Sequence, residues 1–149
     1  MEHKQELFRR LIEKSNKSGN LTSDLGLRVT EVTDGVAEGL VEFTENSINP
    51  RHLVHGGALF GVMDQMAGIA ACTTGYGVVT INGNIDFLRS AVPAEPLRCR
   101  ATVIKPGRRF IATEAVITSE ETGKMVAKGS FTYCVLEELK VTIEEVCAD

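Results

Sequence analysis

The stretch NPRHLVHGGALFGVMDQMAGIAAC, residues 49–72, decides the fold of this chain. It opens as a polar loop that contains a proline, and it passes through Gly56 and Gly57 into residues 58–72, which are apolar nearly all round. A helix with apolar residues on every side is a buried helix, because none of its faces is suited to water. The stretch therefore predicts a long buried helix that begins near the two glycines.

The segments on either side of this helix have the two-residue period of β-strands. Two strands are expected before it, within residues 25–29 and 37–43, and four after it, at residues 79–87, 97–105, 109–118 and 124–135. Turn signals such as Pro106-Gly107 join neighbouring strands as hairpins. Within residues 79–87, the alternation places Thr80 on a polar face together with Asn82. The order of helix and strand segments indicates an α+β protein.

The whole chain, residues 1–149, is expected to form one domain. Its length is enough for a single hydrophobic core and too short for two ordinary ones. Three parts are expected: an amphipathic N-terminal helix within residues 1–19, a core of residues 25–135 and an acidic tail of residues 136–149.

Charge and composition exclude several classes of protein. The net charge is -4, and no basic run is longer than two residues, so no nucleic-acid partner is expected. The longest apolar run contains Asp64 and falls short of the roughly 18 residues of a membrane span, so no membrane partner is expected. The four cysteines fit neither a metal knuckle nor a disulfide framework, and the first residues do not resemble a secretion signal. These features predict a cytoplasmic protein.

Asp64 is the one side chain between His52 and Ile85 that is charged at neutral pH, and it lies within the apolar helix. Burying an ionised carboxylate costs on the order of several kcal/mol unless hydrogen bonds compensate, so such a group is a candidate acid or base. It could equally cap the amides of a neighbouring segment or face solvent on a partly covered helix. The residues alone leave these interpretations open.

The start of the helix supplies a second candidate group. The first N–H groups of a helix have no partner within it, and here Gly56 and Gly57 leave them uncovered. Such groups bind anions or polarise carbonyl groups, although water or an N-cap satisfies most of them. Gly56 and Asp64 are eight residues apart, roughly 12 Å along a helix axis. If both act on one bond, they must come from two antiparallel helices across a dimer interface.

The string from Asn49 to Asp64 resembles the signature of the hotdog-fold thioesterases, in particular the branch related to the phenylacetate-pathway thioesterase PaaI. That family has an Asn six residues before the His, an HGG at the helix start and an acid nine residues after the His, as this chain does. The resemblance implies a long central helix wrapped by a five- to six-stranded antiparallel sheet. It also implies an acyl-CoA thioesterase for short- or medium-chain or aromatic acyl groups.

The resemblance gives each of five catalytic candidates a role. The N–H of Gly56 would polarise the thioester carbonyl, and Asp64 of the other subunit would be the general base or nucleophile. Asn49 would hold the substrate carbonyl or the attacking water, and His55 would shape the loop or the thioester environment. Thr80 stands where a related enzyme has a serine that positions water.

No cofactor is expected, since coenzyme A enters as part of the substrate. A thioester is already activated, so one carboxylate and one or two N–H donors can suffice for its hydrolysis. No metal is expected, because His52 and His55 lack a third ligand. The candidates for binding the substrate and its phosphates are Gly57, Arg89, Lys105, Arg108 and Arg109, although charges at hairpin tips are also commonly just solvated.

The expected assembly is a homodimer with sites shared across its interface, and a dimer of such dimers. Two other functions stay open at this point. One is a non-catalytic module that binds acyl-CoA or an acyl-carrier protein. The other is a hotdog hydratase or dehydratase, whose relatives pair an Asp with a catalytic His, whereas His55 here stands at the thioesterase position.

Overall fold

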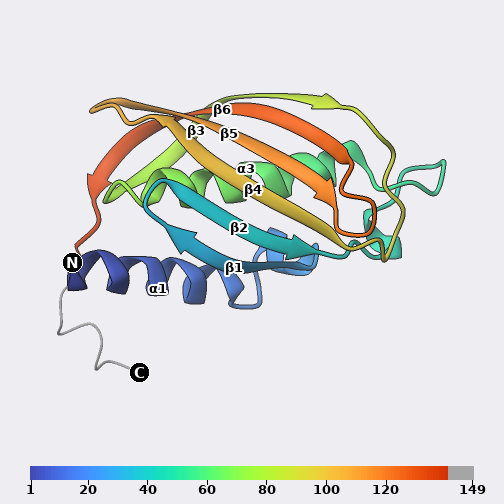
Figure 1. The fold of residues 1–149 in the computed structure, drawn as a ribbon, viewed down its shortest axis with the longest axis horizontal. Helices are drawn as coiled ribbons and strands as arrows, with labels where there is room; N and C mark the ends of the chain where they lie inside the picture. Colours follow the sequence, from blue (N-terminus) through green and yellow to red (C-terminus); the bar gives the residue numbers. More distant parts are fainter. Residues whose placement is uncertain (141–149) are drawn as a thin grey trace.

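The computed structural model describes residues 1–140. Its elements in chain order are α1 (Glu2–Asn16), α2 (Leu21–Asp24), β1 (Leu27–Thr33), β2 (Val36–Val41), the 3-10 helix η1 (Glu45–Ser47), α3 (Gly56–Cys72), β3 (Tyr76–Phe87), β4 (Leu97–Lys105), β5 (Phe110–Ser119) and β6 (Met125–Glu138). The strands form one six-stranded antiparallel sheet in the order β1-β2-β4-β5-β6-β3 (Figure 1). The predicted α+β architecture is confirmed.

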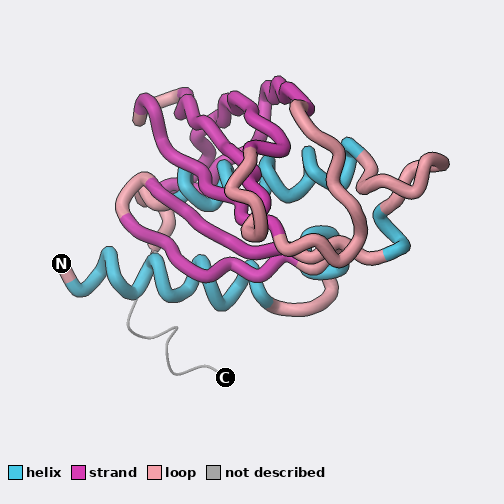
Figure 2. The backbone as a smooth tube through the Cα atoms, turned by 45° about the vertical axis from the view of Figure 1, so that its right-hand side comes forward, coloured by secondary structure: helices cyan, strands magenta, loops and turns pink. Residues whose placement is uncertain are grey.

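The apolar helix α3 fills the space that the curved sheet encloses (Figure 2). Val62, Met63 and Met66 are fully buried, and they pack in one core with the inward side chains of the strands. Leu97 and Cys99 of β4 are buried to the same extent. The sheet covers α3, so the helix has no polar face on the sheet side. This agrees with the buried helix that the all-round apolar sequence predicts.

The two edges of the sheet differ. At the β1 edge, the side chain of Asn16 at the end of α1 pairs with Val29: its amide donates to the Val29 carbonyl at 2.9 Å and its oxygen accepts from the Val29 N–H at 2.8 Å. The opposite edge is β3, which pairs only with β6 within residues 1–140. Val79 and Ile81 remain 48% and 53% exposed there. An uncovered apolar edge is a natural place for another strand to pair.

A β-bulge changes the face on which Thr80 lies. Thr80 pairs with Tyr133, and Asn82 pairs with the adjacent residue of β6, Thr132. Ile81 is therefore an extra residue in β3. Thr80 consequently points inward to α3, where it meets Asp64, while Asn84 lies beside Glu114 and Lys128 on the outer face. The expectation that Thr80 shares a face with Asn82 is wrong, because it assumed an uninterrupted two-residue period.

The ends of some elements differ from the predicted boundaries. Helix α1 ends at Asn16, since Lys17 is extended and Asn16 turns to bond the sheet. Strand β6 continues to Glu138, three residues past the predicted end of the core. The last part of the predicted acidic tail, residues 141–149, lies outside the described residues. Within residues 1–140, no helix is long and apolar enough to cross a membrane.

Candidate active site

The carboxylate of Asp64 is held by two hydroxyl groups from neighbouring strands. Thr80 Oγ1 on β3 and the Tyr133 hydroxyl on β6 each lie 2.8 Å from Asp64 Oδ1. The two hydroxyl residues are direct cross-strand partners, so the strand pairing itself brings them together beneath α3. The polar contacts that a carboxylate needs in an apolar helix are thus supplied by the sheet.

Tyr133 was not identified from the sequence. It is 2% exposed, and its hydroxyl also lies 2.7 Å from the backbone carbonyl oxygen of Asp64. Burial, together with the nearby charge of Asp64, raises the pKa of the Tyr133 phenol well above its usual range. The phenol therefore stays protonated and acts as a donor. The one available signal in the sequence was an aromatic residue with a hydroxyl among the apolar residues of a core strand.

The start of α3 separates the roles of its first two glycines. His55 is the N-cap, and its Nδ1 accepts the Gly57 N–H at 2.7 Å. The backbone N–H of His55 donates to the Ser47 carbonyl at 2.7 Å, which anchors the loop before the helix. Among the described residues, the Gly56 N–H has no hydrogen-bond acceptor. Gly56 is therefore the donor that remains available at this helix start, whereas Gly57 is occupied by the cap.

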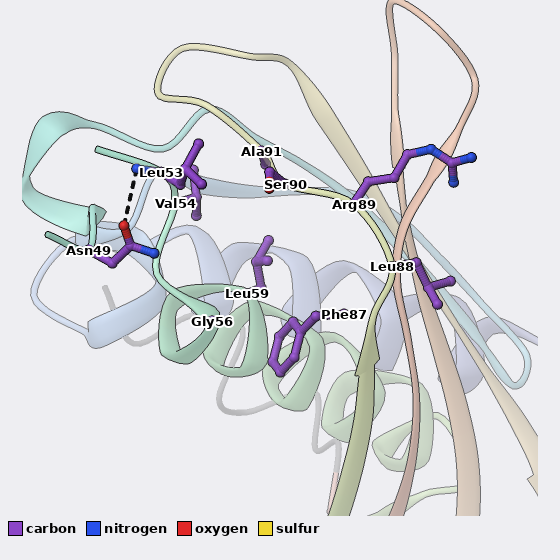
Figure 3. A pocket seen from close by; sticks show the side chains of 10 residues that line it. All are labelled: Asn49, Leu53, Val54, Gly56, Leu59, Phe87, Leu88, Arg89, Ser90 and Ala91. Carbon is purple, nitrogen blue, oxygen red and sulfur yellow. Dashed lines mark hydrogen bonds between the residues drawn. The ribbon is translucent and has the colours of Figure 1, made fainter. Parts of the chain in front are cut away.

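A pocket of about 310 Å³ opens beside this free N–H (Figure 3). Its walls come from the loop before α3, the first turn of α3 and the chain after β3; the lining residues are Asn49, Leu53, Val54, Gly56, Leu59, Phe87, Leu88, Arg89, Ser90 and Ala91. Asn49 and Arg89, both predicted site residues, are thus brought together with Gly56.

Asn49 and Arg89 are each partly engaged by the protein. Asn49 Oδ1 accepts the backbone N–H of Leu53 at 3.3 Å (Figure 3) and that of Arg51 at 2.9 Å, so this oxygen shapes the loop. Its amide nitrogen is the part left to face a ligand. Arg89 donates to the Met125 carbonyl at 3.1 Å, and its exposed guanidinium keeps further donors for an anion.

Asp64 lies in a different groove from Gly56. This second groove, of about 580 Å³, runs between α3 and the β3–β6 pair and is closed at one side by α1; Asp64, Thr80 and Tyr133 line it. Gly56 and Asn49 do not belong to it. The two halves of the predicted catalytic set are therefore separated within one protomer, as the helical spacing predicts.

The predicted basic residues are also divided between the two ends of the molecule. Lys105, Arg108 and Arg109 are exposed at the β4–β5 hairpin, and Arg109 lies 5.7 Å from the ring of Phe110. This hairpin and the loop that leads into Gly56 lie at opposite ends of the sheet (Figure 1). Arg89 alone among the predicted cations lines the pocket beside Gly56.

The described residues include no cluster of three or more His, Cys, Asp or Glu side chains that could hold a metal ion. His55 uses Nδ1 for the helix cap. The chemistry that this arrangement can perform is that of a fixed carboxylate and a separate N–H donor that is free to bind a carbonyl oxygen. Together they suit addition of water to an activated acyl group.

Comparison with known proteins agrees with this chemistry. A family model described as the thioesterase superfamily matches residues 52–126, half of the chain. Human acyl-coenzyme A thioesterase 13 is 27% identical over 129 residues, which are 84% of this chain and 91% of that protein. A hypothetical thioesterase protein from Streptococcus pneumoniae, solved with coenzyme A, is 25% identical with a TM-score of 0.74 and covers 77% of this chain and 92% of that one.

The PaaI protein of Escherichia coli, from the phenylacetic acid degradation operon, superposes with a TM-score of 0.81 over 89% of this chain and 98% of that one, at 21% identity. This likeness defines the fold as the hotdog fold. With the family match, it follows that the chain belongs to the thioesterase superfamily. The predicted resemblance to the PaaI-like branch and the prediction of a thioester hydrolase are both confirmed.

Two variants of the Streptococcus pneumoniae protein have also been solved, one with an Asp-to-Ala and one with a Thr-to-Ala substitution. The two substituted positions are separated by as many residues as Asp64 and Thr80 are in this chain. The spacing in that relative thus equals the spacing of the pair that a hydrogen bond joins here.

Proposed function

We propose that this protein hydrolyses short- or medium-chain or aromatic acyl-CoA thioesters, with Asp64 as the reactive carboxylate and the Gly56 N–H as the donor to the carbonyl. The observation that carries the proposal is the carboxylate of Asp64, which Thr80 and Tyr133 hold on one oxygen, on a residue that lines a groove. A relative solved with coenzyme A and the relationship to an acyl-coenzyme A thioesterase support this choice of substrate.

In the proposed reaction, Asp64 takes a proton from a water molecule whose oxygen attacks the carbonyl carbon. The carbonyl oxygen gains negative charge, and the Gly56 N–H at the positive end of α3 stabilises that charge. The carbon–sulfur bond then breaks, the coenzyme A thiolate takes up the proton, and the free acid remains. Asn49, through its amide nitrogen, would hold the carbonyl oxygen or the water.

The two catalytic groups meet when two protomers pair through their β3 edges. Antiparallel pairing at this edge places the start of one α3 near the middle of the other, because strand and helix directions are reversed in the partner. The exposed apolar residues of β3, Val79 and Ile81, become buried in such a pairing. The β4–β5 hairpin of one protomer would then come to the end that carries Gly56 and Arg89 of the other, where its cations can meet the coenzyme A phosphates.

The proposal is tested by following thiol release from a panel of acyl-CoA substrates with short, medium, long and aromatic acyl groups. Asp64→Asn keeps the size of the side chain and removes its basicity, so it should abolish most hydrolysis. Asp86→Asn is the matched control, since Asp86 lies in the polar patch with Glu114 and Lys128 on the outer face of the sheet. A substrate-free sample corrects for the protein's own cysteines.

Full activity of Asp64→Asn would exclude this mechanism. If the wild type hydrolyses no member of the panel but binds acyl-CoA in a calorimeter, the protein is a binding module rather than an enzyme for these substrates. A single turnover in ¹⁸O-labelled water separates the two forms of the mechanism. Label in the Asp64 carboxylate would show a nucleophilic Asp64 whose anhydride is opened by water at the Asp64 carbonyl carbon, because a general base never forms a bond to the labelled oxygen.

A further inference from the structure

The Tyr133 hydroxyl makes two contacts with one residue. It lies 2.8 Å from the carboxylate oxygen Oδ1 of Asp64 and 2.7 Å from the Asp64 backbone carbonyl oxygen. A group that touches both the main chain and the side chain of a residue restricts the rotation of that side chain. Tyr133 itself is fixed, because its ring is buried in the core and packs over Gly68 of α3.

The two oxygens of the Asp64 carboxylate are unequally occupied. Oδ1 receives both Thr80 and Tyr133. Within residues 1–140, Oδ2 has no hydrogen-bond donor. An ionised carboxylate can accept about four hydrogen bonds, two at each oxygen. Oδ1 is therefore the oxygen that the protein engages, and Oδ2 is left for a ligand or water.

We propose that Tyr133 is a positioning residue for thioester hydrolysis, which fixes the Asp64 carboxylate with Oδ2 directed at the reacting water. This inference rests on the proposed function. Thr80 alone does not fix the carboxylate, because Thr80 lies beside a bulge in the edge strand and is exposed in the protomer. Tyr133 acts from the interior strand β6 and provides the rigid contact. Misplacing a reacting group by about 1 Å can cost about 100-fold in rate, which is why such a contact matters.

The protonation state of the phenol agrees with this role. Burial raises the pKa of Tyr133, and the charge of Asp64 raises it further. The hydroxyl therefore keeps its proton throughout the pH range in which a carboxylate base works, and it donates rather than accepts.

The test is Tyr133→Phe, which removes the hydroxyl and keeps the ring. The expected result is a fall in kcat of about 10- to 100-fold, the range for one hydrogen bond to a charged group, with KM changed less than about twofold. Tyr76→Phe is the matched control, because Tyr76 is the only other tyrosine of the chain and does not line the groove of Asp64. Its kinetic constants should equal those of the wild type.

Two further measurements separate positioning from a structural role and from failure of the proposed function. In an Asp64→Ala background, Tyr133→Phe should leave the residual rate unchanged, since Tyr133 acts through Asp64; a further fall of similar size overturns the proposal. In carbon-13 spectra of protein labelled at aspartate carboxyl groups, the Asp64 signal should shift in Tyr133→Phe and stay in place in Tyr76→Phe. An unmoved signal overturns the proposal even if the enzyme is active. An inactive wild type with a moved signal would contradict the proposed function instead.

Discussion

His55 illustrates how a candidate catalytic residue can contribute by shaping the backbone, which is one of the two roles that the resemblance implies for it. Its Nδ1 accepts the Gly57 N–H and thereby caps α3. Capping also leaves Gly56 as the available donor, because the next N–H along the chain is engaged. The contribution of His55 to the site is therefore to set the geometry of the helix start. Asparagine is among the best N-cap residues and has no imidazole, so it can separate the two roles.

We expect His55→Ala to lower the free energy of unfolding by about 0.5–2 kcal/mol, since the cap is lost. His55→Asn should retain most of that stability and most of the thioesterase activity. Urea unfolding and thiol release measure the two properties. If His55→Asn is as stable as the wild type but as inactive as His55→Ala, the imidazole has a chemical role that capping does not explain.

Thr80 contributes a hydroxyl and a methyl group, and the hydroxyl donates to Asp64. Thr80→Val keeps the shape and removes the donor, so kcat should fall about 10-fold or more with little change in KM. Thr80→Ser keeps the donor and should stay within about threefold of the wild type. Steady-state kinetics on the best substrate of the panel decide this. Equal losses in both variants would indicate that packing of the methyl group matters more than the hydrogen bond.

Part of this site could be predicted from the sequence. Asp64 is conspicuous because a charge interrupts an apolar helix, and Gly56 because the spacing of the HGG motif resembles a known signature. Tyr133 is 69 residues from Asp64 in the sequence. The alternation of residues in β6 indicates only that Tyr133 is an inward-facing aromatic residue. A local sequence pattern does not indicate that the Tyr133 hydroxyl contacts a helix so distant in the chain.

At the scale of elements, the bulge in β3 explains why the sequence pattern assigned Thr80 to the wrong face of the strand. A bulge inserts one residue without any required composition, so the period on each side of it looks intact. Helix α3 was predicted closely because its residues are apolar nearly all round, and strand β4 because apolar and polar residues alternate along it. The short helix α2 was missed, since four residues carry no periodic signal.

Helix α1 protects one edge of the sheet through Asn16. Because Asn16→Ala removes both bonds to Val29, it should lower the free energy of unfolding by about 1–2 kcal/mol. The unpaired edge of β1 should also exchange its amide hydrogens faster. Lys17→Ala, at the exposed neighbouring position, is the control. Denaturant unfolding and hydrogen exchange at Val29 test this prediction, and unchanged exchange would mean that α1 does not seal the edge.

At the scale of the whole molecule, the separation of Gly56 from Asp64 can be tested without a structure of the dimer. Gly56 is the first residue of α3, the helix position where proline is best tolerated. His55, which precedes it, has φ -64 and ψ 136, an extended conformation that a following proline permits. Gly56→Pro therefore removes the N–H with little cost to the helix. Gly56→Ala adds a similar carbon near Phe87 and keeps the N–H, so it is the matched control.

Gly56→Pro and Asp64→Asn should each be inactive alone, because each homodimer lacks one group at both sites. In a mixed dimer with shared sites, one site combines the intact Gly56 of one protomer with the intact Asp64 of the other. Random refolding of an equal mixture makes about half of the dimers mixed, so about a quarter of the wild-type activity should return. A site built within a single protomer would have no intact copy in any of these dimers, and the mixture would stay inactive. Recovered activity would thus show that the catalytic set is divided between two chains.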